Sequence, residues 1–118
     1  MATLKLYGIP NCNTVKKARD WLEKNQIAYE FHDFKKQGVS TALLENWLTQ
    51  IPREQLINRA GLTWRGLQSS VKEDIVDNAS AIALMQAKSS VIKRPIVEKN
   101  GKIICLGFDE ANYKELLK

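Results

Sequence analysis

Cys12 is the residue whose type and position best suit it to chemistry. It follows a turn sequence, Gly8-Ile9-Pro10-Asn11, and precedes a segment in which apolar residues recur every three or four positions. A thiol reacts as its thiolate. At the first turn of a helix, unpaired backbone N–H groups and the helix dipole both stabilise an anion. The sequence therefore predicts a reactive thiolate at Cys12.

The residues after Cys12 provide groups that could stabilise and bind an anion. Asn13, Thr14 and Val15 would offer backbone N–H groups to the sulfur. Thr14 could add a hydroxyl donor, and Lys16 places a positive charge near the first turn. The alternative is that Cys12 is a small buried residue, as free cysteines often are. Its polar neighbours favour the reactive thiol, so Asn13, Thr14 and Lys16 are candidate substrate-binding residues.

The second cysteine, Cys105, has the opposite setting. It follows Ile103 and Ile104 in a predicted strand, so we expect it in the core. The chain has no CxxC motif, and its single histidine, His32, is distant in sequence from both cysteines. A structural zinc site needs about four such ligands, so we expect no metal site. We also expect no disulfide, because cytosolic thiols are kept reduced.

A strand, a helix and a second strand must position Cys12. Residues 3–7 alternate polar and apolar, residues 13–25 have helical periodicity, and residues 28–34 again indicate a strand. This order favours a right-handed βαβ crossover. Residues 35–38 would then form a linker.

The middle of the chain is predicted to be helical. Ser40 is a candidate N-cap for a helix that runs to about residue 50. Pro52 suits the first turn of a short helix that Gly61 would end. Two more helices are expected near residues 67–76 and 79–87. Trp21, Trp47 and Trp64 are expected to serve packing.

The last part of the chain returns to strands. Residues 96–98 and 103–105 flank an Asn100-Gly101 pair, which predicts a β-hairpin. Asp109 is the expected N-cap of a final helix, and Phe108 can pack against Tyr113.

These elements together predict an α/β protein with a thioredoxin-like fold. The order is β-α-β and then β-β-α, which gives a mixed four-stranded sheet with an inserted helical subdomain. We expect a single domain over residues 1–118, with the core at about 1–38 and 88–118 and the insert at about 40–87. Cys12 lies where this plan places a reactive sulfur, after the first strand and before the first helix.

Arg94 and Pro95 form the second candidate feature, because a proline directly before a strand often marks a special turn. In a thioredoxin plan their peptide bond would be cis and would face Cys12, and Arg94 would place an anion-binding guanidinium near the sulfur. The alternative is a surface arginine beside an ordinary loop proline. Arg59 and Arg65, in the predicted insert, are more often solvated residues of this kind.

Composition limits the classes of function. The chain has 118 residues, 44% of them hydrophobic, and a formal net charge of +5 that is spread along the sequence. No basic run resembles a nucleic-acid tail, no apolar run of about 20 residues could span a membrane, and the first residues lack a signal-peptide core. We therefore expect a cytoplasmic monomer that binds neither nucleic acid nor membrane. The spread charge also suits an anionic small substrate.

Two segments resemble a known family. The sequence from Tyr7 to Ala18 (YGIPNCNTVKKA) resembles the opening of the arsenate reductase-like family, which has a thioredoxin fold with a helical insert. Residues 94–97 (RPIV) resemble its second hallmark. The resemblance covers essentially the whole chain and is closest to the YffB-type branch, which implies a glutathione-dependent thiol reductase. It implies Cys12 as nucleophile, with Arg59 and Arg94 as two of the three arginines that the family's arsenate reductases place near the sulfur.

The chain departs from the pattern of the family's arsenate reductases at two places. No arginine occurs in residues 105–107, where the third would fall, and Gly8 stands where arsenate reductases carry a histidine. Two arginines suit a carboxylate, such as that of glutathione, better than a doubly charged oxyanion. The expected activity is therefore a glutathione-linked monothiol reaction at Cys12 without a bound cofactor.

Two alternatives remain open. One is a genuine arsenate reductase. The other is a non-enzymatic regulator of the Spx-like branch, which binds RNA polymerase. Many members of that branch carry a CxxC switch, and the second cysteine position of such a switch is Val15 here. An internal disulfide switch is thereby excluded.

Overall fold

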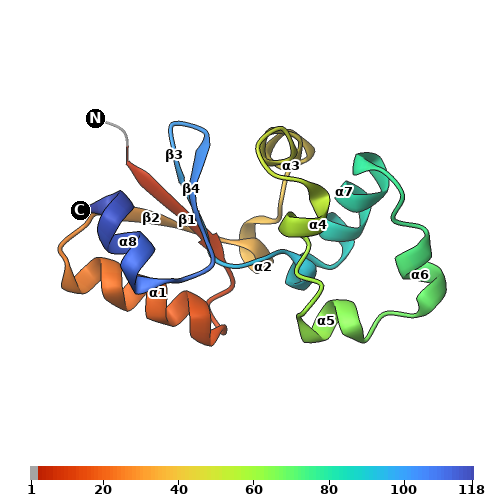
Figure 1. Ribbon diagram of the computed structural model, residues 1–118, viewed down its shortest axis with the longest axis horizontal. Helices are drawn as coiled ribbons and strands as arrows, with labels where there is room; N and C mark the ends of the chain where they lie inside the picture. The colour runs from red at the N-terminus through yellow and green to blue at the C-terminus, as the bar shows by residue number, and fades with distance from the viewer. Residues whose placement is uncertain (1–2) are drawn as a thin grey trace. The chain divides into compact units, whose positions relative to one another are not determined.

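The computed structural model describes residues 3–118 (Figure 1). The described chain forms two compact units, one made of residues 3–37 and 94–118 and the other of residues 38–93. Met1 and Ala2, with which the predicted core begins, lie outside the described residues.

The first unit contains a mixed four-stranded sheet with strand order β2-β1-β3-β4. Strand β1 is parallel to β2 and antiparallel to β3, and β3 is antiparallel to β4. The predicted α/β fold and its mixed sheet are confirmed. The elements of this unit are β1 (Leu4–Gly8), α1 (Asn13–Lys24), β2 (Tyr29–Asp33), α2 (Phe34–Gln37), β3 (Ile96–Lys99), β4 (Lys102–Leu106) and α8 (Glu110–Leu117).

One face of this sheet carries the core of the first unit, and α1 and α8 cover it (Figure 1). Cys105 belongs to this core with an exposed fraction of 7%, as its apolar setting predicts. The rings of Trp21 and Tyr113 meet edge to face across it, with their centroids 5.6 Å apart. The buried members are Leu4, Leu6, Val15, Ala18, Trp21, Leu22, Val97, Cys105 and Tyr113.

Local signals fix the hairpin and the last helix. Asn100 and Gly101 both have positive φ, 55° and 77°, as a two-residue hairpin turn requires. Asp109 accepts backbone hydrogen bonds from Ala111 and Asn112 and so caps α8. The Phe108 ring lies 4.8 Å from the Tyr113 ring. These predictions from the sequence are confirmed.

The second unit is built from short helices. They are α3 (Thr41–Leu48), α4 (Arg53–Leu56), α5 (Leu62–Arg65), α6 (Ser69–Glu73), α7 (Asn78–Ala87) and the 3₁₀ turn η1 (Ser89–Val91). Ser40 caps α3, because its hydroxyl accepts a hydrogen bond from the Leu43 N–H. Leu44, Trp47 and Met85 are completely buried and form part of its interior.

The prediction that residues 40–87 are helical throughout is wrong at residues 57–61. Helix α4 ends at Leu56, and Ile57 is extended and forms an antiparallel bridge with Ile92. The Asn58 N–H donates to the Val91 carbonyl at 2.7 Å. This pairing with a segment over thirty residues away stops the helix where a β-branched residue occurs. Gly61, expected to end that helix, instead precedes α5.

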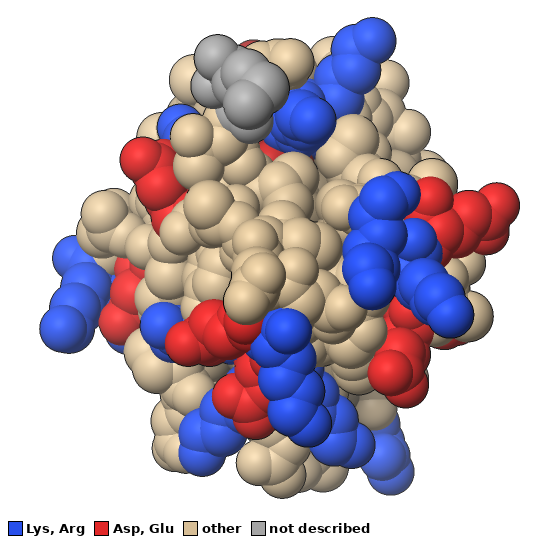
Figure 2. Space-filling view, turned by 90° about the vertical axis from the view of Figure 1, so that its left-hand side faces the viewer, with Lys and Arg blue, Asp and Glu red and all other residues tan. Residues whose placement is uncertain are grey.

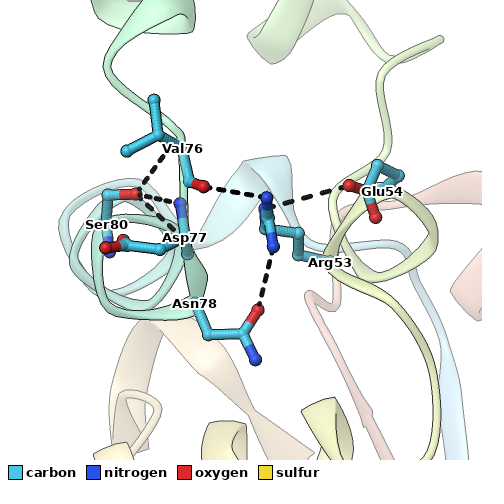
Figure 3. A network of polar contacts seen from close by, with 6 residues as sticks. All are labelled: Arg53, Glu54, Val76, Asp77, Asn78 and Ser80. Atoms are coloured by element: carbon cyan, nitrogen blue, oxygen red, sulfur yellow. Dashed lines mark hydrogen bonds and ion pairs between the residues drawn. The ribbon is translucent and has the colours of Figure 1, made fainter.

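Arg53 joins the start of α4 to the start of α7 (Figure 3). Its Nη2 donates to the Val76 carbonyl at 2.9 Å, and its Nη1 lies 3.4 Å from Asn78 Oδ1. Beside these contacts, Asp77 and Ser80 form a capping box that begins α7. The same arginine forms a loose ion pair with Glu54 at 3.8 Å.

Candidate active site

Cys12 occupies the N-cap position of α1 in the first unit. Its backbone is extended, with φ −135° and ψ 124°, and its carbonyl accepts the first helical hydrogen bond from the Lys16 N–H at 2.9 Å. The side chain is half-buried at the edge of the core. The sulfur thus lies at the positive end of a twelve-residue helix while remaining open to solvent.

Gly8 lets β1 approach α1 closely just before this cysteine. A β-carbon at residue 8 would lie 2.8 Å from Cγ2 of Val15, which is closer than side chains can pack. Val15 is completely buried. The glycine found where arsenate reductases carry a histidine therefore has a packing role in this chain.

The surroundings of the Cys12 sulfur lower the pKa of its thiol. Burial is the largest single effect and raises the pKa, but hydrogen bonds to the thiolate outweigh it. The Val15 N–H contributes first, followed by the hydrogen bond and the positive charge of the Arg94 guanidinium and then by the Thr14 N–H. A thiolate at this position is therefore favoured at a lower pH than in a free cysteine.

Arg94 reaches the sulfur from the segment that enters β3. Its peptide bond with Pro95 is cis, and Pro95 is buried directly before Ile96. The structure thus brings together two of the predicted site residues, Cys12 and Arg94, from segments far apart in the sequence.

The other candidate residues differ in what they provide. Thr14 supplies its backbone N–H to the sulfur rather than its hydroxyl. Asn13, Thr14 and Lys16 have exposed side chains. Lys16 makes no side-chain polar contact with any of residues 3–118, so its ammonium is available to an anionic ligand. Their predicted roles in substrate binding stay predictions.

Arg59 lies in the second unit, on the short turn between α4 and α5. It is exposed, and its guanidinium carbon lies 5.3 Å from the centre of the buried Trp64 ring. This cation–π contact holds the arginine within its own unit. Its expected partnership with Cys12 stays a prediction, and Arg65 is an exposed residue of α5.

Residues 105–107, where the family pattern would place a third arginine, lie beside the cis-proline. The Gly107 N–H donates to the Pro95 carbonyl at 2.8 Å, and Ile96 pairs with Leu106. This place beside the cis-proline therefore carries a leucine and a glycine, neither of which can neutralise an anion.

Cys105 is poorly suited to resolve a disulfide at Cys12. Burial raises the pKa of the Cys105 thiol to about 11, so it is protonated at neutral pH. Both cysteines are reduced. Within residues 3–118 no group of three or more His, Cys, Asp or Glu side chains could hold a metal ion. In the same range no helix is long and apolar enough to cross a membrane.

Arg19 lies seven residues after Cys12 and is not among the site residues that the sequence predicts. Its guanidinium carbon is 4.1 Å from the centre of the Phe31 ring, and its Nε donates to the Tyr29 hydroxyl at 3.0 Å. The available signal was an arginine within about two turns of Cys12 on the predicted helix.

The site consists of a cysteine at a helix N-terminus and an arginine that precedes a cis-proline, and it lies on a mixed four-stranded sheet. The chain belongs to the ArsC family, whose model matches residues 7–116. Among relatives, a protein of Haemophilus influenzae without a named function is 36% identical over 111 residues, which are 94% of this chain and 96% of the relative. The global transcriptional regulator Spx of Streptococcus agalactiae is 27% identical and covers 97% of this chain and 82% of its own.

Solved structures confirm the fold. A YffB protein is 42% identical and superposes with a TM-score of 0.90 over 98% of this chain and all of its own. A protein from Brucella melitensis, described as related to arsenate reductase (ArsC), is 47% identical with a TM-score of 0.78, covering 98% of this chain and 95% of its own. The predicted membership of the arsenate reductase-like family is therefore confirmed.

Proposed function

We propose that this protein is a glutathione-dependent monothiol oxidoreductase that uses Cys12 as its nucleophile. The observation that carries the proposal is the place of Cys12 at the N-cap of α1, where the Val15 and Thr14 N–H groups and the Arg94 guanidinium lower the pKa of its thiol. The likeness to YffB and to an arsenate reductase-related protein supports thiol chemistry in general. The cytoplasm, where glutathione is reduced, is the proposed compartment.

The proposed reaction is a two-step thiol–disulfide exchange. The Cys12 thiolate attacks the glutathione sulfur of a mixed disulfide R–S–S–G, so that a Cys12–glutathione disulfide bond forms while the S–S bond of the mixed disulfide breaks. The R–S⁻ group leaves and takes a proton from solvent. The thiolate of a second glutathione then attacks that adduct, which releases oxidised glutathione and restores the Cys12 thiolate. The balance is R–S–S–G + GSH → R–SH + GSSG.

The residues around the sulfur have distinct roles in this scheme. Arg94 and the first turn of α1 stabilise the thiolate both as the attacking group and as the leaving group. Arg59 is proposed to bind a carboxylate of the substrate. The resolving thiol must come from outside, because Val15 stands at the fourth position and Cys105 is buried with a raised pKa.

Mass spectrometry after incubation with oxidised glutathione tests this function. We expect a single glutathione adduct on Cys12 that added reduced glutathione removes. Cys12→Ser should lose the adduct, and Cys105→Ser, as the matched control, should keep it. If the unchanged protein forms no adduct, glutathione linkage is wrong.

A regulatory role is the second candidate, and it rests on the Spx relatives, one of which is 27% identical over nearly the whole chain. A protein of this kind would bind RNA polymerase without using Cys12 as a nucleophile. The purified chain and its Cys12→Ser variant should then retain RNA polymerase equally well in a pull-down. Recovery of no polymerase would remove this candidate.

Arsenate reduction is tested separately, because the place beside Pro95 carries Leu106 and Gly107 in place of a third arginine. We expect arsenate to be reduced more slowly than a glutathione mixed disulfide when glutathione is the electron donor. Equal or faster arsenate turnover would favour a genuine arsenate reductase.

A further inference from the structure

Arg19 is the cationic side chain of α1 that is fixed by contacts with neighbouring aromatic residues. It is half-buried, its guanidinium carbon lies 4.1 Å from the centre of the Phe31 ring, and its Nε donates to the Tyr29 hydroxyl. Tyr29 in turn donates to Glu23 Oε2 at 3.3 Å. An arginine stacked on an aromatic ring with Nε occupied has lost much of its rotamer freedom before any ligand binds.

The remaining donors of Arg19 are available to a ligand. Its terminal nitrogens Nη1 and Nη2 donate to no group within residues 3–118, and the side chain forms no ion pair there. The carboxylate of Glu23, four residues further along α1, accepts its described hydrogen bond from Tyr29. The two terminal nitrogens form the planar fork that matches a carboxylate.

Arg19 lies about two turns of α1 beyond Cys12. Cys12 is the extended N-cap residue before the first turn, and Lys16 and Arg19, three positions apart within the helix, share one face of α1. The separation of seven residues is about 10 Å along the axis. Side chains of a helix lean toward its N-terminus, so Arg19 leans toward Cys12.

The contacts of Arg19 with strand β2 also indicate that its guanidinium points toward the end of the sheet where Cys12 lies. Strands β1 and β2 are parallel, so their carboxyl ends lie at one edge of the sheet, and Cys12 follows β1 at this edge. The Arg19 guanidinium carbon is closer to the ring of Phe31, at 4.1 Å, than to that of Tyr29, at 5.9 Å. Phe31 is the residue nearer that edge.

We propose that Arg19 is a specificity-determining residue that binds a carboxylate of the thiol joined to Cys12. The inference rests on the proposed function and names its ligand class, a peptide-like thiol with a carboxylate at the far end. In an extended tripeptide with a central cysteine, a terminal carboxylate lies about 5–7 Å from that cysteine, and the lean of the long Arg19 side chain toward the start of α1 shortens the axial separation of about 10 Å that remains to be spanned. Lys16 lies between Cys12 and Arg19 in the sequence and adds positive charge to α1. An uncharged disulfide would not be attracted by the charge of Lys16 or Arg19.

The experiment compares an anionic and an uncharged disulfide in single-turnover reactions with Cys12. Oxidised glutathione carries the carboxylates, and hydroxyethyl disulfide lacks them. We expect Arg19→Gln to slow adduct formation with oxidised glutathione about five- to tenfold and to leave the rate with hydroxyethyl disulfide unchanged. Arg19→Lys should recover part of the loss, because it keeps the charge without the fork.

Lys17→Gln is the matched control, since it removes one positive charge from the same helix on a different side. It should change both rates by less than about twofold. A second variant, Tyr29→Phe, frees Arg19 from its Nε contact and should reduce the preference for oxidised glutathione without removing charge.

The outcomes separate this inference from the proposed function. If Arg19→Gln reacts with oxidised glutathione as fast as the unchanged protein, Arg19 has no such role and the proposed function stands. If both disulfides slow equally, the effect is structural and the inference is wrong. If the unchanged protein reacts with hydroxyethyl disulfide but not with oxidised glutathione, both are wrong.

Discussion

Groups of two kinds lower the pKa of the Cys12 thiol. The N–H groups of Val15 and Thr14 are fixed by the first turn of α1, whereas the guanidinium of Arg94 is held by a side chain. The backbone donors stay in place for as long as the helix exists, and among side-chain substitutions only one to proline would delete them. A substitution at Arg94 therefore separates the two contributions to thiolate stability.

Arg94→Gln is expected to raise the pKa of Cys12 by removing a positive charge and its hydrogen bond. Because only the thiolate alkylates, the rate of iodoacetamide labelling should fall several-fold below pH 7 and match that of the unchanged protein above about pH 10, where either thiol is ionised. Measured rates across the pH range check this. Arg65→Gln, in the second unit, is the charge-matched control, and identical profiles for all three proteins would contradict the role of Arg94.

Gly8 and Val15 couple the first strand to the first helix. A β-carbon at Gly8 would lie 2.8 Å from Val15 Cγ2, so Gly8→Ala should overpack the junction and cost about 1–3 kcal/mol of unfolding free energy. In the double variant with Val15→Ala the space reopens, and the two costs should not add. Urea denaturation of the single and double variants measures this coupling. Additive losses would show that the contact is not the cause.

Arg53 connects two helices of the second unit (Figure 3). Arg53→Met should cost about 1–2 kcal/mol, because it removes the hydrogen bonds to the Val76 carbonyl and to Asn78. Glu54→Gln is the control: its ion pair with Arg53 is long, at 3.8 Å, and partly exposed, so its loss should be close to neutral. If thermal denaturation shows that Arg53→Met and Glu54→Gln lower the unfolding free energy equally, the ion pair and not the hydrogen bonds of Arg53 provides the stability.

The elements that could be predicted are those stabilised by interactions between residues close together in the sequence. Helix α1 has the expected apolar spacing, and the Asn100-Gly101 turn and the Asp109 cap depend on local chemistry. The Ile57–Ile92 bridge could not be predicted, because it depends on a partner 35 residues away. Helix α5 has only four residues, which is too short for a periodic pattern.

The residues of the candidate site also differ in whether the sequence could predict them. Cys12 could be predicted from its place before a helix, because the stabilising N–H groups come from the next three residues. The contact with Arg94 required the expected fold, since it joins segments some eighty residues apart. Arg19 was missed because its holding partners, Tyr29 and Phe31, lie on the next strand.

Basic residues are spread along the sequence, and one face of the molecule carries charges of both signs (Figure 2). On the face that Figure 2 shows, Lys and Arg side chains alternate with Asp and Glu around an uncharged centre. The net charge of +5 is thus spread, and selection of an anionic substrate falls to individual residues such as Arg19 and Arg94.

The path of the chain couples the folding of the two units. The first unit is discontinuous, because residues 38–93 form the second unit between its halves. Closing an unfolded loop of this length costs about 3–4 kcal/mol of entropy. When the second unit is folded, its Ile57–Ile92 bridge and its buried Trp47 already restrict that segment. A stable second unit therefore stabilises the first, even with no assumption about contact between them.

Cys105 can report this coupling, because its thiol is buried and labels only when the first unit opens. In a Cys12→Ser background, Leu22→Ala in the first core should accelerate Cys105 labelling strongly. Leu44→Ala in the second unit, where Leu44 is completely buried, should cost about 2–5 kcal/mol locally. It should also accelerate labelling, by a smaller factor. If Leu44→Ala leaves the labelling rate unchanged while lowering the stability of the second unit, the two units fold independently.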